Sequence, residues 1–205
     1  ISPQMLSFAK QRAISFGLQD VIEFKEGDAE TIYLPHLSFD AALCRWGLML
    51  IPDPNAGLSN IYRSLVNGGH FAAAVWGSPD KVPFIFVPMN TVLQETNCPP
   101  PPPGTPGPFS MSDQNSLKNL YVSSGFIDPA IERLNVVFDF NSSDDFTTFS
   151  IEHGGPALQK MLAGQTNERR EEIFKAISRA AEKYVDNTTG KVRLENEAIL
   201  IVGRK

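Results

Sequence analysis

The sequence predicts an α/β protein built on a mostly parallel sheet with an antiparallel last strand. Over residues 1–77, segments of helical periodicity and apolar runs of strand length follow one another with short links. The runs at 39–46 and 70–77 lack polar alternation, which is typical of strands covered on both faces. Two further strand-like segments, 130–140 and 195–205, follow helix-rich stretches. We expect these two to pair antiparallel and complete the sheet.

The first half of the chain supplies two helices and three strands. Ser2 and Pro3 form an N-cap and first-turn pair, and Gly17 ends the helix that they open. Residues 21–25 (VIEFK) are predicted as a short strand running into an acidic turn. A helix from about 55 to 66 follows the second strand, and the glycine pair at 68–69 is expected to close it.

The second half of the chain differs in composition, with a proline-rich segment and several predicted helices. Residues 97–110 (NCPPPPPGTPGPFS) fit neither a helix nor an inner strand because prolines lack a backbone donor, so we expect a stiff loop. Ser112 or Asp113 caps the helix after it, and a break at Gly154–Gly155 divides a later one. The helices expected here cover residues 80–96, 112–126, 142–162 and 166–185.

Length and composition exclude several classes of protein. The 205 residues suit a single domain, with 1–77 and 126–205 as the core and 78–125 as a lid or insert. A net charge of -5 argues against nucleic-acid binding, and no apolar run is long enough to span a membrane. Cys44 and Cys98 lie far apart without metal-ligand spacing. We therefore expect reduced thiols, no metal site and a cytoplasmic location.

Several motifs in register resemble the class I S-adenosylmethionine-dependent methyltransferases, in particular the type 11 small-molecule group. The matching segments are ISPQML, GDAE, FDAALCRWGLMLIPDP, SNIYRSLVNGGHFAAAVW, PGPFSMSDQNSLKNLYVSSGF and AILIVGRK. None of these motifs is specific alone, but their order and spacing cover nearly the whole chain. The resemblance implies a Rossmann-like sheet with a helical lid and S-adenosylmethionine as the cofactor.

The sequence departs from this family at its start. Members begin with a strand, a glycine-rich turn, a helix and a second strand that ends in an acidic residue. Here the chain opens at Ile1 as a helix begins, and its 15 glycines include no G-x-G-x-x-G pattern behind a strand. We therefore expect an N-terminally incomplete fold that lacks half of the cofactor pocket. If the 205 residues are the complete chain, we expect a homodimer or an exchanged segment that covers the open strand edge.

The resemblance assigns cofactor contacts to the carboxyl ends of the strands. Asp28 would accept a hydrogen bond from the adenine amino group, and the backbone N–H of Ala29 would face a ring nitrogen. The cofactor-binding residues that the resemblance implies are Ile1, Met5, Asp28, Ala29, Arg45 and Trp46. Plain structural roles compete with these assignments. Asp28 equally suits a turn, Arg45 could pair with Asp53, and Trp46 could pack in the core or lid.

The acceptor side of the site is predicted to be apolar. The substrate-binding candidates are Trp46, Met49, Trp76 and Phe84, although packing roles fit the last three as well. His153 is the candidate catalytic base if the acceptor must lose a proton, and a solvated histidine is the alternative. The segment RWGL lacks the Asn/Asp-Pro-Pro-aromatic signature of amino-methylating enzymes. A small carbon or oxygen acceptor is therefore favoured over nucleic acid.

Three functional hypotheses remain from the sequence. The first is a methyltransferase, and the second is a catalytically inactive methyltransferase fold that acts as a structural or binding module. A nucleotide-dependent oxidoreductase is a distant third, because neither its glycine fingerprint nor its ribose-binding acid is present.

Overall fold

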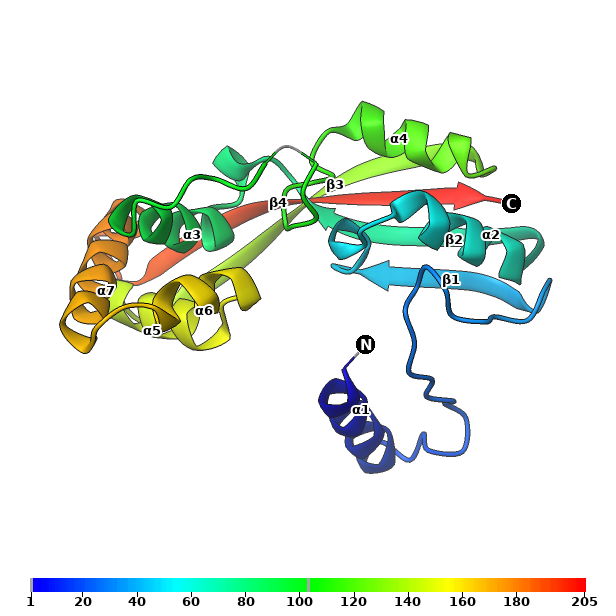
Figure 1. The fold of residues 1–205 in the computed structure, drawn as a ribbon, viewed down its shortest axis with the longest axis horizontal. Helices are drawn as coiled ribbons and strands as arrows, with labels where there is room; N and C mark the ends of the chain where they lie inside the picture. The colour runs from blue at the N-terminus through cyan, green and yellow to red at the C-terminus, as the bar shows by residue number, and fades with distance from the viewer. Residues whose placement is uncertain (1, 103) are drawn as a thin grey trace.

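A four-stranded sheet forms the centre of the protein in a computed structural model, which describes residues 2–102 and 104–205 (Figure 1). Its strands lie in the order β1 (Phe39–Arg45), β2 (Leu65–Trp76), β4 (Val192–Arg204) and β3 (Ile127–Phe140). β1 and β2 are parallel, whereas β4 is antiparallel to both of its neighbours. Three strands therefore point one way and the last strand in the chain points the other, which confirms the predicted fold class.

One face of the sheet is covered by α2 (Pro54–Ser64) and α4 (Gln114–Ser123). Alternation along the strands turns every second side chain toward these helices, so that Phe71, Val75 and Ile199 are fully buried there. Leu58 from α2 and Tyr121 from α4 pack into the same cluster. Phe71 and Tyr121 stack with ring centroids 5.4 Å apart. This cluster fixes the half of the sheet that holds β1 and β2.

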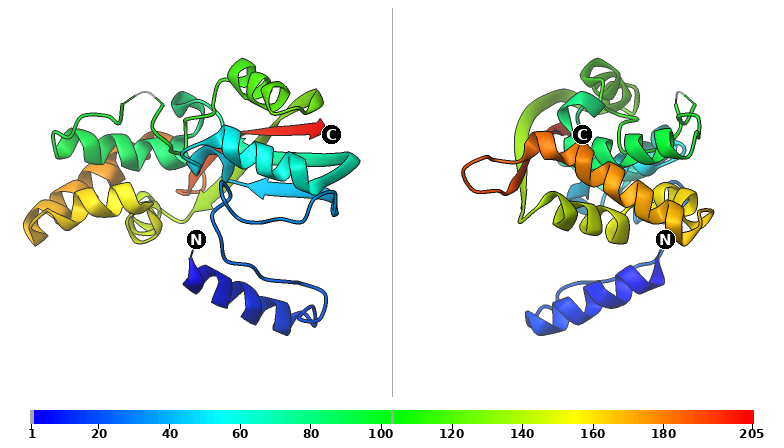
Figure 2. Two further views of the ribbon diagram at one scale, coloured as in Figure 1. Left: turned by 45° about the vertical axis from the view of Figure 1, so that its right-hand side comes forward. Right: turned by 90° about the vertical axis from the view of Figure 1, so that its left-hand side faces the viewer.

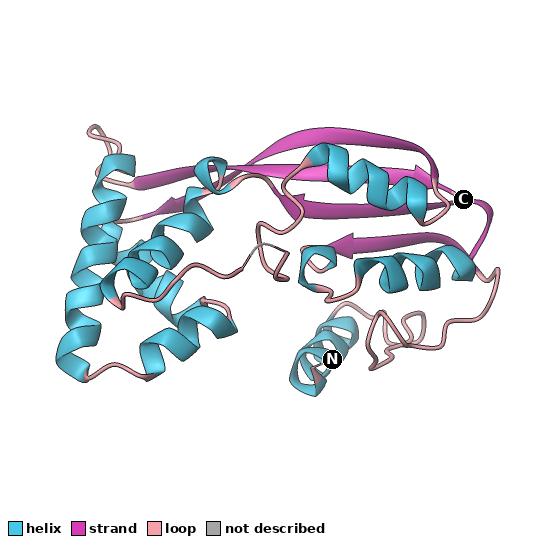
Figure 3. Ribbon diagram, turned by 45° about the horizontal axis from the view of Figure 1, so that its top comes forward, coloured by secondary structure: helices cyan, strands magenta, loops and turns pink. Residues whose placement is uncertain are grey.

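A second cluster lies at the far end of β3 and β4, where a lobe of helices gathers (Figure 3). The helices of this lobe are α3 (Pro83–Glu95), α5 (Ser143–His153), α6 (Pro156–Ala163) and α7 (Asn167–Ala181). Phe146, Ile173 and Leu194 are fully buried among them. The two long strands β3 and β4 run through both clusters and join them.

Helix starts follow the predicted capping chemistry. Ser2 accepts from the backbone N–H of Met5 at the start of α1 (Pro3–Ser15), and Asp113 accepts from that of Ser116 at the start of α4. The Gly154–Gly155 break separates α5 from α6 as expected.

Three short 3-10 turns complete the structure: η1 (Leu48–Leu50), η2 (Pro79–Lys81) and η3 (Glu182–Tyr184). No helix among the described residues is both long and apolar enough to cross a bilayer.

The glycine pair at 68–69 does not close α2, so that prediction was wrong. The helix ends at Ser64, and both glycines lie inside β2, where three extra residues separate two consecutive pairings with β1. Gly68 has φ +83 and donates to the carbonyl of Lys205. A Cβ on Gly69 would lie 3.0 Å from the carbonyl oxygen of Asp40, so only glycine fits this approach of the two strands.

The predicted strand at residues 21–25 was also wrong. This segment lies outside helices and strands, and Val21 is 75% exposed. A strand needs a hydrogen-bonding neighbour, and no strand of the described chain pairs with these residues. Figures 1 and 2 show α1 and the segment after it extending away from the sheet.

The prediction that β1 is covered on both faces was wrong as well. β1 is an edge strand, and Leu43 at its centre is 84% exposed. Leu43 belongs to the open face of the sheet, opposite α2 and α4, which holds a hollow of about 690 Å³. Besides Leu43 and Arg45, the open face includes Ala72, Ala74, Glu132, Leu200 and Val202. The apolar run FDAALCR therefore reflects small and apolar side chains on an uncovered surface.

Candidate functional site at the carboxyl ends of two parallel strands

The carboxyl ends of β1 and β2 meet at a pair of stacked indoles. Trp46 directly follows β1, Trp76 ends β2, and their ring centroids lie 3.9 Å apart with planes 11° from parallel. Trp46 has φ +59, a left-handed conformation that is uncommon for a bulky residue, and its N–H donates to the carbonyl of Ala74 at 3.0 Å. Such conformations cost about 1–3 kcal/mol and cluster at functional sites.

The turn after the indole pair is tied to the proline-rich loop. Met49, in η1, is buried, so its side chain has the packing role that the sequence offered as an alternative. Its carbonyl accepts from the backbone N–H of Gly107 at 3.0 Å and from the hydroxyl of Ser110 at 2.8 Å. The proline-rich loop that follows α3 is therefore hydrogen-bonded to η1, three residues after Trp46.

The protein side of this site is largely uncharged. Burial raises the pKa of the Cys44 thiol, although backbone N–H groups of Gly47 and Leu48 oppose the shift. Burial, with a smaller effect from Cys44, raises the pKa of the Tyr121 hydroxyl, which has no hydrogen-bond partner among the described residues. Arg45 is exposed at the end of β1. Asp53, its suggested ion-pair partner, caps α2 by accepting from the backbone N–H groups of Asn55 and Ala56.

The acidic turn after residue 25 lies against α2. Asp28 Oδ1 accepts from the backbone N–H of Glu30 at 3.0 Å, which is the turn role that the sequence allowed. Asn60 Nδ2 of α2 donates to the carbonyls of Ala29 at 3.2 Å and of Ile32 at 2.7 Å. Glu30 Oε1 accepts from the backbone N–H of Asp53 at 2.9 Å. The adenine contact of Asp28 remains a prediction.

Asn60 is a positioning residue that the sequence reasoning missed. Its side chain sits within the helix pattern SNIYRS, where a polar residue is normally solvent-facing, but its amide is buried against the turn.

We expect Asn60→Ala to loosen the turn at 28–32, because two buried carbonyls lose their shared donor. The expected cost is about 1–3 kcal/mol in the free energy of unfolding, with faster amide exchange confined to this turn. Hydrogen exchange and urea unfolding measure the two effects. Asn55→Ala, an exposed asparagine on the same helix, is the matched control. Equal exchange in both variants would contradict the positioning role.

The other predicted site residues lie elsewhere. Met5 is 73% exposed on α1, apart from the indole pair, and Ile1 lies outside the described residues. Phe84 begins α3 and stacks on Phe138 with ring centroids 4.2 Å apart. His153 ends α5, where Nδ1 lies 3.1 Å from the carbonyl oxygen of Phe149. The structure thus brings Trp46, Met49 and Trp76 together in one cluster, with Arg45 exposed next to Trp46 in the chain, and places Phe84 and His153 in the helical lobe.

Comparison with known proteins bears on the family and the fold. Residues 1–73 match the family described as "Methyltransferase domain". A putative methyltransferase from Bacillus halodurans aligns with all of this chain and 80% of its own, with a TM-score of 0.61 and 19% identity. The YcgJ protein from Bacillus subtilis aligns with all of this chain and 79% of its own, with a TM-score of 0.60 and 17% identity. Residues 1–73 thus resemble a methyltransferase domain, and the whole chain has the fold of these two structures.

Curated relatives match little more than a third of the chain. The ubiquinone/menaquinone biosynthesis C-methyltransferase UbiE of a Bradyrhizobium species is 38% identical over 71 residues, which are 35% of this chain and 28% of that protein. The demethylmenaquinone methyltransferase of Deinococcus radiodurans is 38% identical over 77 residues, 38% of this chain and 31% of that protein. The matched part of this chain therefore covers less than a third of the length of each of these relatives.

Proposed function

We propose that the chain acts in S-adenosylmethionine-dependent methyl transfer to a small apolar acceptor, at carbon or oxygen. The observation that carries this proposal is the stacked pair Trp46–Trp76 at the carboxyl ends of two parallel strands. In open α/β sheets, ligands bind beyond this edge. The methyltransferase-domain match ends within β2, so it includes Trp46 and the turn at 28–32.

The residues present fit part of the cofactor. Asp28, Ala29 and Arg45 offer a carboxylate, a backbone donor and a guanidinium, which suit the adenine and the amino-acid carboxylate. The cofactor supplies an already activated methyl group. Trp46 would orient it with an aromatic face, and the apolar surroundings would exclude water. Met5 would contribute only if α1 approached the sheet, because it is now 73% exposed.

The acceptor side supports an apolar, planar substrate. Trp76 and Met49 are buried behind Trp46, so the indole pair presents a rigid aromatic surface. Both relatives described above are named as quinone-pathway methyltransferases, and a ring acceptor would suit the same surface. Within this proposal, Phe84 lines the lid side and His153 acts as the base for acceptors that must lose a proton.

A catalytically inactive module is the second candidate. Two observations favour it: the uncovered β1 edge and the separation of α1 from the strands that carry Arg45 and Trp46. Such a chain would keep the fold but bind no cofactor.

Calorimetry with S-adenosylhomocysteine separates the two candidates. We expect micromolar binding to the 205-residue chain, weakened about tenfold or more by Trp46→Ala. Stacking of a base on an aromatic side chain is worth about 1–3 kcal/mol, and 1.4 kcal/mol is a factor of ten. Trp46→Phe, which keeps a ring, is the control and should bind within a few-fold of the parent. A folded chain that binds nothing would refute the first candidate in favour of the inactive module.

A further inference from the structure

The loop between α3 and α4 carries a run of prolines that the candidate site does not use. Residues 99–103 are five consecutive prolines, and the structure describes the first four of them. These four are exposed, and none of them belongs to either hydrophobic cluster of the described chain. Figures 1 and 3 show the segment running back from the helical lobe toward α4. Packing in the core therefore does not account for the run.

The conformation of the run is fixed by its own residues. The proline ring holds φ at about −65°, and a following proline keeps the residue before it out of the helical region. Consecutive prolines therefore adopt the polyproline II helix, which has three residues per turn. This period places Pro99 and Pro102 on the same side of the helix. Their spacing is that of the P-x-x-P pattern, which binds grooves lined by aromatic side chains.

Both ends of the loop are tied to the body of the protein. At its start, the N–H of Cys98 donates to the carbonyl of Leu93 at 3.0 Å, in the last turn of α3. At its other end, the N–H of Gly107 donates to the carbonyl of Met49 at 3.0 Å. A partner would therefore meet a segment that is already ordered, and binding would lose little conformational entropy.

The backbone acceptors and one side of the run are open. The carbonyl of Pro102 accepts from the N–H of Thr105 at 3.1 Å, but those of residues 99–101 accept from no donor among residues 2–102 and 104–205. A hollow of about 420 Å³ is lined by Pro99, Pro100 and side chains of α3 such as Leu93. This hollow leaves space between the prolines and the helix, so a partner can contact the run there as well.

We propose that residues 99–102 are a docking site for a protein domain whose groove is lined by aromatic side chains and binds polyproline II segments. The rings of the groove pack against Pro99 and Pro102, and indole or hydroxyl donors beside them bond to the open carbonyls. This interaction is independent of the proposed function, since no cofactor takes part in it.

Charge decides which kind of groove fits. No lysine, arginine, aspartate or glutamate occurs from residue 96 to residue 112. Glu95, the nearest charged residue before the run, is paired with Arg169 at 2.7 Å. A groove that uses an acidic pocket to bind a flanking arginine or lysine would find no cation in this stretch. The partner that fits therefore recognises the prolines through aromatic rings and hydrogen bonds alone.

Calorimetry of the 205-residue chain against three purified domains tests the proposal. The probes are a WW domain and an EVH1 domain, which have aromatic grooves, and an SH3 domain whose groove ends in an acidic pocket. We expect a Kd below about 1 mM for the WW or the EVH1 domain, at least about tenfold weaker binding to the SH3 domain, and displacement by a polyproline peptide. No binding to either aromatic groove, binding to the SH3 domain that is as tight, or binding that the peptide does not displace would overturn the proposal.

Two variants locate the binding. Pro99→Ala combined with Pro102→Ala should weaken it at least about tenfold, because the change removes both rings from one side of the helix. Pro106→Ala, at an exposed proline of the same loop outside the run, is the matched control and should bind like the parent. Thermal unfolding verifies that both variants remain folded, as expected for exposed positions. Binding that survives the double substitution, or that Pro106→Ala weakens equally, would refute docking at residues 99–102.

Discussion

Replacement of Asn196 by alanine should lower the free energy of unfolding by about 2–4 kcal/mol. Asn196 is 1% exposed in β4, and its Nδ2 donates to the carbonyls of Val136 at 3.0 Å and Leu194 at 2.9 Å. Its Oδ1 accepts from the backbone N–H of Phe84 at 2.9 Å, at the start of α3. Alanine removes all three hydrogen bonds, each worth about 0.5–1.5 kcal/mol, and leaves the Phe84 N–H without its partner, which costs about 1–3 kcal/mol where the group is buried.

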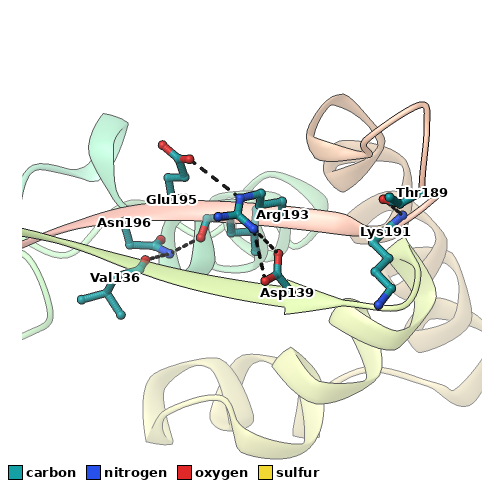
Figure 4. Close-up of polar contacts among 8 residues, drawn as sticks. Val136, Asp139, Thr189, Lys191, Arg193, Glu195 and Asn196 are labelled. Atoms are coloured by element: carbon teal, nitrogen blue, oxygen red, sulfur yellow. Dashed lines mark hydrogen bonds and ion pairs between the residues drawn. The ribbon is translucent and has the colours of Figure 1, made fainter.

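Asn196 links α3 to the sheet, and we expect it to contribute more to stability than the nearby Arg193–Asp139 ion pair. Figure 4 shows it between β4 and Val136 of β3, with Arg193 and Asp139 farther along the same strands. Arg193 Nη1 lies 3.3 Å from Asp139 Oδ1, but both side chains are about half exposed, so solvent screens the pair. Urea unfolding of Asn196→Ala against Asn135→Ala, an exposed neighbour, isolates the buried network. Equal stability of these two variants would contradict the prediction.

Gly203→Ala should destabilise the protein by about 1–3 kcal/mol. A Cβ at this position of β4 would lie 2.8 Å from Tyr121 Cδ1 and 3.0 Å from Phe126 Cβ. Both rings are buried and Tyr121 also stacks on Phe71, so neither can move without disturbing the core. Overpacking of this kind outweighs the 0.5–1 kcal/mol or so that replacing a strand glycine normally gains.

Thermal and urea unfolding measure this effect. Gly155→Ala is the control, because no heavy atom lies within 4 Å of a Cβ built there and its φ is negative. We expect the control to change stability by less than about 0.5 kcal/mol. Gly203→Ala with the stability of the control would mean that the cluster around Tyr121 can expand.

Much of the fold was predictable because local chemistry determined it. N-caps at Ser2 and Asp113, the prolines after Cys98 and the Gly154–Gly155 break all act within a few residues. The antiparallel last strand was also predicted correctly. The wrong predictions, such as the covered β1, depend on which elements lie next to a segment in space, and a sequence pattern does not contain that information. An apolar run such as FDAALCR has the same composition on a covered strand as on an open edge, and only the neighbours decide its exposure.

The site was predicted in part for the same reason. Trp46 directly follows β1 and Trp76 ends β2, and parallel strands bring their carboxyl ends to one edge, so the proximity of the two indoles followed from the order of elements. The indole stacking and the φ of Trp46 required coordinates. Asn60 was missed because its role depends on a turn about 30 residues earlier in the chain, which no helical periodicity reveals.

The long β3–β4 ladder has a mechanical consequence for the helical lobe. These strands pair from Ile131 with Ile201 to Phe140 with Val192, without a register shift over that stretch. The ladder therefore passes from the cluster beneath α4 into the helical lobe, where Phe140 and Val192 pack. The helical lobe is thus joined to the rest of the sheet by the two-stranded β3–β4 ribbon as well as by loops. Any movement of the lobe relative to the other half of the sheet would have to twist this ribbon, so the stiffness of the ribbon would limit that movement.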